Sequence, residues 1–566
     1  MKAQLPTVLT LLSPGLLQVA ATFAVLGVAF HLSIRKIEID YRLWHLSAVY
    51  LFVWATLVGI YVKLFDLSWL LALTTACFAG LCFNVSLAAS IAAYRLFFHR
   101  LRNFPGPWGA KLSRVYAVKL ASKNLQYHLE LQNLHKKYGD FVRTGPREIS
   151  IIRPSAVQAI NGPKSACMRS TWYSQVSDDV TIISLNSTRD VDVHRRRRRA
   201  WDRGFSVKAI STYAPRVRSK VDVFINQLRT RTGEPVNITE WSMFLTFDVM
   251  GAIGFGKDFK QLEEAKEHGA IKGLHEQMAI LGLLAHLPWF LSLLASLPGL
   301  TGSYGTFTEY CHDQVKERIT KWEQMKSQDP TDVISWLIKA LKEKDSSAPP
   351  GEVALQEDGR LLIIAGSDTT GATLANALYF LTANPSVFKE LQTQLDGLFS
   401  EIGEGFTYDQ VRDIPYLEAI INETLRLKPA VPSGQQRVTP PGGLQIDEVW
   451  IPEDVNVVVP QYTIQRDNRN FPEGEKFLPE RWLVENKGKM ILNEQAYFPF
   501  QLGQYSCVGK QLALMELRLA IVLFALNFDV VLAPGEDGVK FDQGAQDTFT
   551  FTVSALQVVL KERARP

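Results

Sequence analysis

The sequence predicts a mainly α-helical domain with small β-sheets, preceded by transmembrane helices. Long stretches with helical periodicity dominate the second half of the chain; they cover residues 353–381, 415–427 and 510–528. Short segments with strand character are scattered among them, at 435–438, 455–459 and 548–553. The first hundred residues differ from the rest, because they carry three long apolar blocks.

Each apolar block reaches the length of about 20 residues that crosses the hydrocarbon core of a bilayer. The blocks lie near residues 7–32, 43–62 and 67–94. A cleaved signal peptide explains the first block less well, because its apolar run is too long and two further blocks follow. The alternative to three true spans is a single anchor with two membrane-associated helices. A glycosylation sequon at Asn84 lies inside the third block, and we attribute it to chance.

Basic residues lie between the first two blocks and again directly after the third. They are Arg35, Lys36, Arg42, Arg95, Arg100 and Arg102. The positive-inside rule predicts that both places are cytosolic, which makes the N-terminus lumenal. A stretch rich in proline and glycine at 104–109 then marks a hinge. We therefore predict a membrane anchor over residues 1–103 and one catalytic domain over residues 104–566.

Overall composition excludes some classes of partner and site. The chain has 566 residues, 61 of them basic and 57 acidic, so bulk charge gives no reason to expect a nucleic-acid partner. Its 5 cysteines lack CxxC spacing, which argues against a disulfide scaffold or a zinc site and favours a reducing compartment.

One of these cysteines, Cys507, lies between glycines at the start of an apolar helix, in the stretch FQLGQYSCVGK. Flanking glycines let the backbone bend tightly, and a helix N-terminus favours a thiolate. Such a sulfur could be a nucleophile, a redox thiol or a metal ligand. The ordinary alternative is an inert buried cysteine.

Three further motifs carry polar residues in helical surroundings. In AGSDTT, Asp368 and Thr369 interrupt a long apolar helix. In ETLR, Glu423 and Arg426 lie three apart on one helical face, and in PERW a second arginine, Arg481, precedes a tryptophan. Each motif alone is weak, since such pairs are usually solvated.

Together, in this order and spacing, the four motifs resemble those of the cytochrome P450 family. The resemblance runs from residue 104 to the end of the chain. The stretches HRRRRRAWDRGFS and CVGKQLALMELR are most similar to membrane-anchored fungal members. The resemblance implies the cytochrome P450 fold.

It also implies heme b as the cofactor, with Cys507 as the axial ligand of the iron. An anionic sulfur in that place favours cleavage of the O–O bond. Phe500 is then the aromatic residue beside the sulfur, and Gly503 and Gly509 keep the loop close to the porphyrin.

The same resemblance implies functions for the residues of the other motifs. Asp368 and Thr369 are expected to relay protons to oxygen, while Ala365 and Gly366 leave room for it. Glu423, Arg426 and Arg481 are expected to form a buried structural ion triad. Removing one member of such a triad strands a charge.

The two heme propionates need cationic or hydrogen-bonding partners. The resemblance implies His194, Arg198 and Arg437 for this purpose. The family usually has an arginine two residues before the cysteine, where this chain has Tyr505, so propionate binding by the loop is in doubt.

The remaining arginines of the run cannot share one helical face. We expect them to form a docking surface for an acidic reductase, with Arg196 and Arg197 as candidates.

The function implied is that of a monooxygenase that inserts one atom of O2 into a lipophilic small molecule, for example in secondary metabolism such as terpenoid biosynthesis. Electrons come from NADPH through a separate cytochrome P450 reductase, because the chain lacks a dinucleotide-binding motif. The expected location is the endoplasmic reticulum membrane, with a cytosolic catalytic domain and the lipid bilayer as a partner.

Substrate-lining segments are expected at 167–190, 361–369, 429–436 and 546–551. The alternatives are a membrane heme protein that binds or senses ligands without turnover, and a reductase-independent isomerase or dehydratase.

Overall fold

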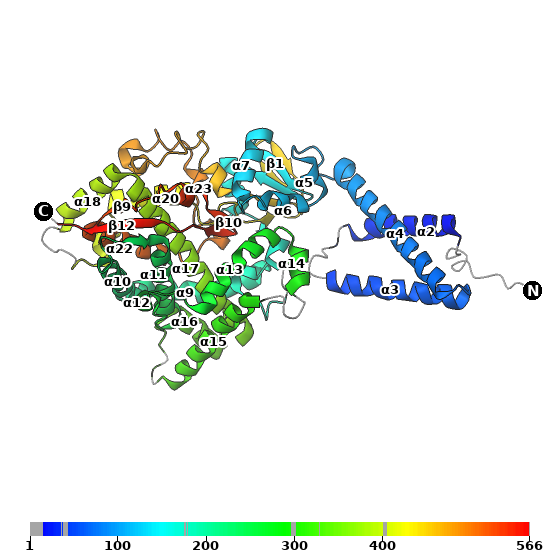
Figure 1. The fold of residues 1–566 in the computed structure, drawn as a ribbon, viewed down its shortest axis with the longest axis horizontal. Coiled ribbons are helices and arrows are strands. Elements are labelled where there is room, and N and C mark those ends of the chain that lie inside the picture. Colours follow the sequence, from blue (N-terminus) through cyan, green and yellow to red (C-terminus); the bar gives the residue numbers. More distant parts are fainter. Residues whose placement is uncertain are drawn as a thin grey trace, which may run out of the picture.

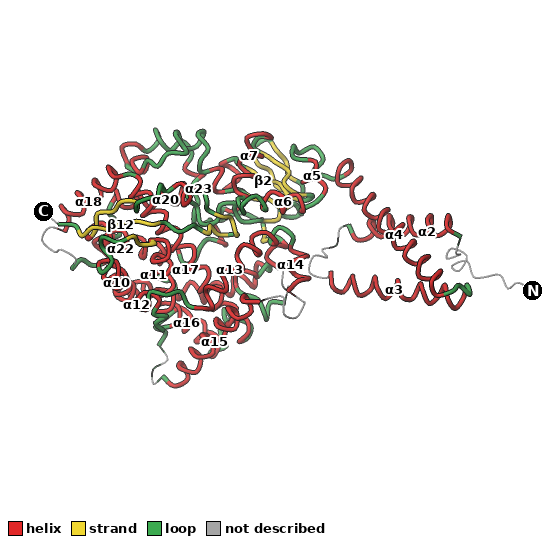
Figure 2. The backbone as a smooth tube through the Cα atoms, in the orientation of Figure 1, coloured by secondary structure: helices red, strands yellow, loops and turns green. Residues whose placement is uncertain are grey.

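Three apolar helices project from one end of a larger, mainly helical body (Figure 1). Helices make up most of the body, and its short strands gather in two regions (Figure 2). The computed structural model describes residues 15–35, 37, 43–174, 177, 179–295, 302–325, 327, 329–399 and 405–564.

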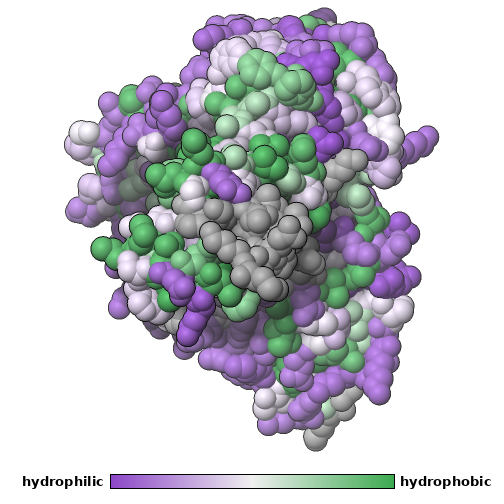
Figure 3. Space-filling model, turned by 90° about the vertical axis from the view of Figure 1, so that its right-hand side faces the viewer, coloured by the Kyte–Doolittle hydropathy of each residue, from purple (hydrophilic) through white to green (hydrophobic). Residues whose placement is uncertain are grey.

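The projecting helices are α2 (Leu16–Ile34), α3 (Leu43–Leu64) and α4 (Trp69–Ala93), which continues as a π-helix, η1 (Tyr94–Phe98). Within the described residues, these 3 helices are long and apolar enough to cross a membrane. They agree with the three predicted blocks, although residues 7–14 of the first block lie outside the described residues. Viewed from the anchor end, apolar surface lies near the centre and hydrophilic surface toward the rim (Figure 3).

Helices α2 and α4 approach each other closely at Gly27. A Cβ atom at this position would lie 2.2 Å from the Ser86 hydroxyl oxygen, so only glycine permits the contact. At the C-terminal ends of the same helices, the Arg35 guanidinium lies 5.6 Å from the centre of the Tyr94 ring. The basic ends of the first and third apolar helices therefore lie on the same side of the anchor, next to the body.

The body contains long helices joined by shorter ones. The longer helices are α7 (Tyr127–Tyr138), α9 (Val191–Gly204), α10 (Val207–Arg229), α11 (Ile238–Met250), α13 (Gly269–Leu284), α15 (Gly302–Gln324), α16 (Val333–Lys342), α17 (Glu352–Ala383), α18 (Pro385–Phe399), α20 (Pro415–Leu427) and α22 (Lys510–Asn527). The shorter ones are α5 (Trp108–Leu112), α6 (Val115–Ala121), α8 (Pro154–Asn161), α12 (Gln261–Glu264), α14 (Pro288–Ala295), α19 (Tyr408–Val411), α21 (Gln461–Ile464) and α23 (Val539–Gln543).

The strands form four small sheets. Five strands pair in the order β1 (Phe141–Gly145), β2 (Glu148–Ile151), β8 (Asn456–Val458), β5 (Arg437–Val438) and β3 (Met168–Arg169). Three pair in the order β4 (Pro235–Asn237), β12 (Gln557–Glu562) and β9 (Phe528–Leu532). The hairpins are β6 (Leu444–Ile446) with β7 (Val449–Ile451) and β10 (Gln546–Thr548) with β11 (Thr550–Thr552). The strand predicted at 548–553 is confirmed in part, since β11 lies within this range. Thr548 belongs to β10 instead, because the chain reverses at Phe549, whose φ is 83°.

Helix α17 forms the centre of the body, where it packs against α11, α15 and α22. Gly366 explains the close approach of α11, since a Cβ there would lie 1.9 Å from the Met250 sulfur. This glycine therefore faces a neighbouring helix.

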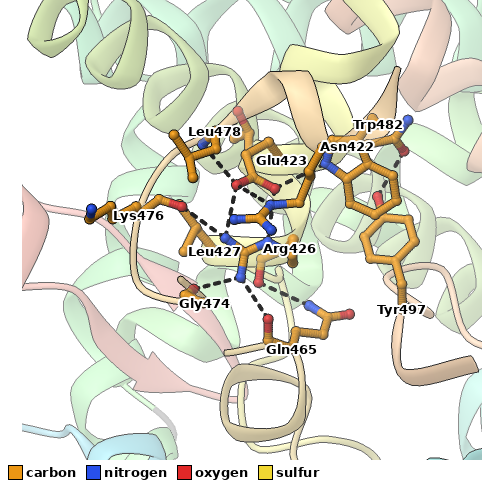
Figure 4. A network of polar contacts seen from close by, with 12 residues as sticks. Asn422, Glu423, Arg426, Leu427, Gln465, Gly474, Lys476, Leu478, Trp482 and Tyr497 are labelled. Atoms are coloured by element: carbon orange, nitrogen blue, oxygen red, sulfur yellow. Dashed lines mark hydrogen bonds and ion pairs between the residues drawn. The ribbon is translucent and has the colours of Figure 1, made fainter. Parts of the chain in front are cut away.

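A fully buried ion network joins α20 to the segment that precedes the cysteine loop (Figure 4). Glu423 binds the guanidinium groups of Arg426, at 2.8 and 2.9 Å, and Arg481, at 3.0 Å. It also accepts hydrogen bonds from the Leu478 amide and the Trp482 indole, each at 2.9 Å. Burial raises the pKa of Glu423, but these bonds and charges outweigh it and hold the pKa below its usual value.

The arginines use their other N–H groups to bind backbone carbonyls. Arg426 donates to Gln465, Gly474 and Lys476, as Figure 4 shows. Arg481 donates to Pro472 and Met490. One carboxylate thus fixes the path of an irregular segment that has little secondary structure of its own.

We predict that Arg481→Leu lowers the free energy of unfolding by about 3–5 kcal/mol, because it leaves the buried carboxylate short of one cation. Lys476→Ala is the matched control. It removes an exposed ion pair to Glu473, for which we expect less than about 1 kcal/mol. Thermal unfolding followed by circular dichroism compares the two.

If Arg481→Leu does not fold, Trp482→Phe tests the same network, because it removes only the indole N–H bond to Glu423. Equal stability of a network variant and the surface control would contradict the prediction.

Candidate active site

Cys507 lies in a tight loop between the short 3-10 turn η8 (Gly503–Tyr505) and helix α22. The loop is closed by a hydrogen bond from the Cys507 amide to the Phe500 carbonyl, at 2.8 Å. Gly503 has a φ of 61°, and a Cβ there would lie 2.6 Å from the Gly162 carbonyl oxygen. Backbone packing against the end of α8 therefore requires this glycine. Gly509 is less constrained, since its Cβ would meet the Cys507 sulfur at 3.9 Å, an ordinary contact distance.

The Cys507 side chain is exposed although it lies deep inside the protein. The thiol therefore borders an internal space and does not lie in the packed core. Burial raises the pKa of Cys507, while the amides of Gly509 and Lys510 and the charges of Arg198 and Lys510 act in the opposite direction. The ammonium group of Lys510 lies 5.6 Å from the centre of the Phe500 ring. Electropositive groups thus surround a thiol that a metal cation would deprotonate.

A cluster of basic side chains surrounds the ring of Tyr505. The guanidinium carbons of Arg169 and Arg437 lie 4.5 and 4.7 Å from its centre, within cation–π range. The two arginines are direct cross-strand partners on β3 and β5. The His194 ring, from α9, lies 4.9 Å from the same tyrosine. We call Arg169, His194, Arg437 and Tyr505 the basic cluster.

The basic cluster lacks a negative partner within the part of the chain that the structure describes. Neither buried guanidinium forms an ion pair with a carboxylate, and one nitrogen of each, one of His194 and the Tyr505 hydroxyl have no hydrogen-bond partner. Burial, followed by the charges of Arg169 and Arg198, lowers the pKa of His194 to about 2, so its ring is neutral. Arg169 and Arg437 donate to neutral oxygens, but a buried cation without an anionic partner is costly. The arrangement fits an anionic ligand with carboxylate groups.

Arg198 takes part differently. It donates to the Ser506 carbonyl at 2.8 Å and pairs with Asp202 at 2.7 Å, so it ties α9 to the cysteine loop.

The other arginines of the run point in different directions, as predicted. Arg195 and Arg196 are exposed. Arg197 is buried and pairs with Asp358 of α17 at 3.0 Å. The expectation that Arg197 belongs to a docking surface is therefore wrong, because a buried ion pair occupies it.

The middle of α17 carries the predicted acid and alcohol. Ala365 is exposed, although it belongs to the central helix of the body, so this part of α17 also borders an internal space. The Thr369 hydroxyl donates to the Ala365 carbonyl at 2.8 Å. Asp368 is buried, and its carboxylate oxygen Oδ1 lies 3.4 Å from Nε2 of His275 on α13.

A pocket of about 70 Å³ brings together three of the four predicted substrate-lining segments. Trp172 comes from the first, Ser433 and Gln436 from the third, and Phe549 from the fourth. The rings of Trp172 and Phe549 stack at 4.7 Å. Asp547, which accepts a hydrogen bond from Ser433, adds a carboxyl whose pKa burial raises to about 6.

Sequence reasoning missed Arg169, His275 and Glu267. Arg169 reaches the basic cluster only through the pairing of β3 with β5, which lie far apart in the sequence. His275 and Glu267 carry no motif, and a single histidine in an amphipathic helix gives no signal of its own. Only the folded chain places them.

Comparisons with known proteins agree with this geometry. The family model described as cytochrome P450 matches residues 105–558. A cytochrome P450 monooxygenase, orf5, from Eupenicillium brefeldianum is 40% identical over 479 residues, which cover 85% of this chain and 95% of that protein. The monooxygenase FCK2 from Fusarium pseudograminearum is 36% identical, with 96% and 97% covered. Tryprostatin B 6-hydroxylase from Aspergillus fumigatus is 34% identical, with 85% and 84% covered.

The fold is similar to the crystal structure of the cytochrome P450DA heme domain, with a TM-score of 0.64 and 18% sequence identity. The likeness covers 79% of this chain and 95% of that one. Family and fold are those of heme-thiolate enzymes, and heme b suits both an accessible internal thiol and a basic cluster that needs carboxylates. The chain belongs to the cytochrome P450 family, as a heme-dependent monooxygenase.

Proposed function

We propose that this monooxygenase inserts one atom of O2 into a lipophilic small molecule, with electrons from NADPH through a separate cytochrome P450 reductase. The observation that carries the site assignment is the Cys507 thiol, which is exposed to an internal space beside basic groups. Heme bound there supplies oxygen activation, and an anionic sulfur ligand favours O–O cleavage. Cys507 is thus assigned as the axial ligand, with Phe500, Gly503 and Gly509 shaping its loop.

The basic cluster is assigned to the heme propionates. Arg437 and His194 were expected in this role, and Arg169 joins them. Tyr505 takes the place of an arginine without adding charge, and its ring supports the two guanidinium groups. Arg198 is better described as a positioning residue, because its bonds go to Ser506 and Asp202.

On α17, Asp368 and Thr369 are assigned to proton delivery. In the structure the Thr369 hydroxyl hydrogen is directed to the Ala365 carbonyl, next to the internal space. A hydroxyl in this place can donate its proton into the internal space, provided that a nearby acid then supplies a new proton to the hydroxyl oxygen. Asp368, the adjacent residue, is that acid. Glu423, Arg426 and Arg481 are assigned a structural role only.

The substrate class rests on the residue types of the expected lining segments, which mix apolar side chains with serine, threonine and glutamine. The small pocket between three of these segments combines the stacked rings of Trp172 and Phe549 with polar side chains, among them Gln436 and Asp547. Such segments suit a largely apolar molecule with one or two polar groups, for example a terpenoid or another secondary metabolite. The relative named a 6-hydroxylase supports hydroxylation as the reaction type.

The anchor supports placement in a bilayer, with the endoplasmic reticulum as the proposed location. Residues 1–103 would span the membrane three times and hold residues 104–566 at its cytosolic face. Helix α14 lies against α3, and Trp108 and Ile280 are exposed apolar residues of the body. Exposed Arg195 and Arg196 suit an acidic reductase.

We predict that the reduced, carbon monoxide-treated protein has the long-wavelength Soret band of thiolate-ligated heme, and that Cys507→Ala lacks it. Cys311→Ala is the matched control, because Cys311 is a second cysteine of the body whose side chain lies in the packed core, where burial raises its pKa. Loss of the band in the control alone, or a histidine-type band in the native protein, would contradict the assignment.

We predict that Tyr505→Leu releases heme faster than Tyr505→Phe, because the leucine removes the aromatic support under Arg169 and Arg437 whereas the phenylalanine keeps it. Arg437→Gln should accelerate release by about tenfold or more, as expected for a charged hydrogen bond. Transfer of heme to apomyoglobin measures the rate. Arg412→Gln, at an exposed arginine with carboxylate neighbours, is the control. Equal rates in all four variants would refute a propionate role.

We predict that Thr369→Val raises the molar ratio of hydrogen peroxide to NADPH toward one in the reductase-reconstituted enzyme. Two electrons reduce O2 to peroxide, and four reduce it to water, which requires further protons. Thr373→Val is the control, because Thr373 makes the same type of helix bond one turn later. The prediction fails if both variants give the native ratio.

A further inference from the structure

His275, on α13, lies between two carboxylates that come from different parts of the chain. Its Nδ1 lies 2.5 Å from Oε1 of Glu267, and its Nε2 lies 3.4 Å from Oδ1 of Asp368. Side-chain exposure is 27% for Glu267, 31% for His275 and 8% for Asp368. Two partly exposed groups therefore lead to the buried acid on α17.

The surroundings of His275 fix its charge. Burial lowers the pKa of His275, but the bonds to Asp368 and Glu267 outweigh burial and raise it to about 10. The ring is therefore an imidazolium at neutral pH, and both of its N–H groups donate. From α11, the Phe247 ring packs edge-on at 6.1 Å. Glu240 of the same helix faces Glu267, and burial, followed by the charge of Glu267, raises the pKa of Glu240.

The two contacts of the imidazolium are unequal. The bond to Glu267 is short and the contact with Asp368 is long, so Glu267 holds the ring while Asp368 is held loosely. A cation bound this firmly is a poor proton donor. It can, however, orient a neighbouring buried carboxylate through a charge-assisted hydrogen bond.

We propose that His275 and Glu267 form a charged latch that positions the Asp368 carboxylate for proton delivery to Thr369. The latch consists of these two side chains, and His275 is a positioning residue. When Asp368 leaves Nε2, its carboxylate takes a proton from a solvent hydronium ion, which leaves water, and passes that proton to the Thr369 oxygen. The Thr369 hydroxyl gives its own proton to the reduced oxygen species in the internal space, so that Asp368 ends as a carboxylate and Thr369 as a hydroxyl. The imidazolium keeps both of its protons throughout. This inference rests on the role proposed above for Asp368 and Thr369.

The first test measures the latch without turnover. The stability that the charged His275 contributes is present in full below the pKa of an unfolded histidine, about 6.5. It is lost as pH rises through about 10, the value in the folded protein. We therefore expect the melting temperature of the heme-loaded native chain to exceed that of His275→Gln at pH 6, and the difference to shrink by pH 10. A difference that does not change with pH overturns the charged latch.

The second test separates positioning from a purely structural role. The reductase-reconstituted enzyme is assayed for the molar ratio of hydrogen peroxide to NADPH, without added substrate. We expect His275→Gln to raise this ratio by at least about twofold, and His275→Lys to bring it back toward the native value because lysine restores the charge. His312→Gln is the matched control, since His312 pairs with Glu357 at 2.9 Å, and Glu357 lies about three turns from Asp368 on the same helix.

The outcomes distinguish the two proposals. A raised ratio in Asp368→Asn and His275→Gln but not in His312→Gln supports the latch. A raised ratio in Asp368→Asn alone overturns the latch and leaves the assignment of Asp368 intact. A native ratio in Asp368→Asn overturns that assignment and the latch with it.

Discussion

The buried carboxylate of Glu423 is the interaction on which the cysteine side of the molecule depends. It accepts bonds from two arginines, one indole and one amide, and those arginines bind carbonyls between residues 465 and 490. This stretch has few helical or strand bonds to hold its shape. It also leads directly into the loop that carries Cys507. An ion network of this kind adds little net stability. Its value lies in giving an irregular segment a single conformation that regular structure cannot provide.

The sequence predicts the long elements well because their signal is local. Helix α17 was predicted over 353–381 and covers Glu352–Ala383, and α20 matches at both ends. Because hydrophobic periodicity is read over many residues, a few residues that break the pattern do not change the predicted helix. The β10–β11 hairpin was missed because its reversal depends on one left-handed residue, Phe549, in a run of β-forming residues. The packing of Gly366 against Met250 was not predicted for a related reason, since Met250 comes from another helix.

The site is predictable where a residue type is chemically unusual in its local sequence, as with Cys507 among glycines or Asp368 within an apolar helix. It is not predictable where a common residue becomes special through distant partners. Arg169 acquires its environment from strand register, and Arg197 is removed from the surface by Asp358, a residue 161 positions away. In the sequence, Tyr505 is notable only because the family usually has an arginine at this position. Its ring is in fact the surface over which two other arginines lie.

His194 and His275 show how the surroundings of a histidine in this fold decide whether its ring is charged. His194 lies among arginines, and their repulsion adds to burial, so that its pKa falls to about 2 and the ring is neutral. His275 lies between carboxylates, which overcome burial and raise its pKa to about 10. A histidine is thus neutral among the arginines of the basic cluster, and it is a cation between the carboxylates of Glu267 and Asp368. Because both values are far from neutrality, neither ring changes its charge between pH 5 and 8. In the proposed mechanism, proton movement near α17 therefore involves Asp368, Thr369 and water, and His275 contributes only its fixed positive charge.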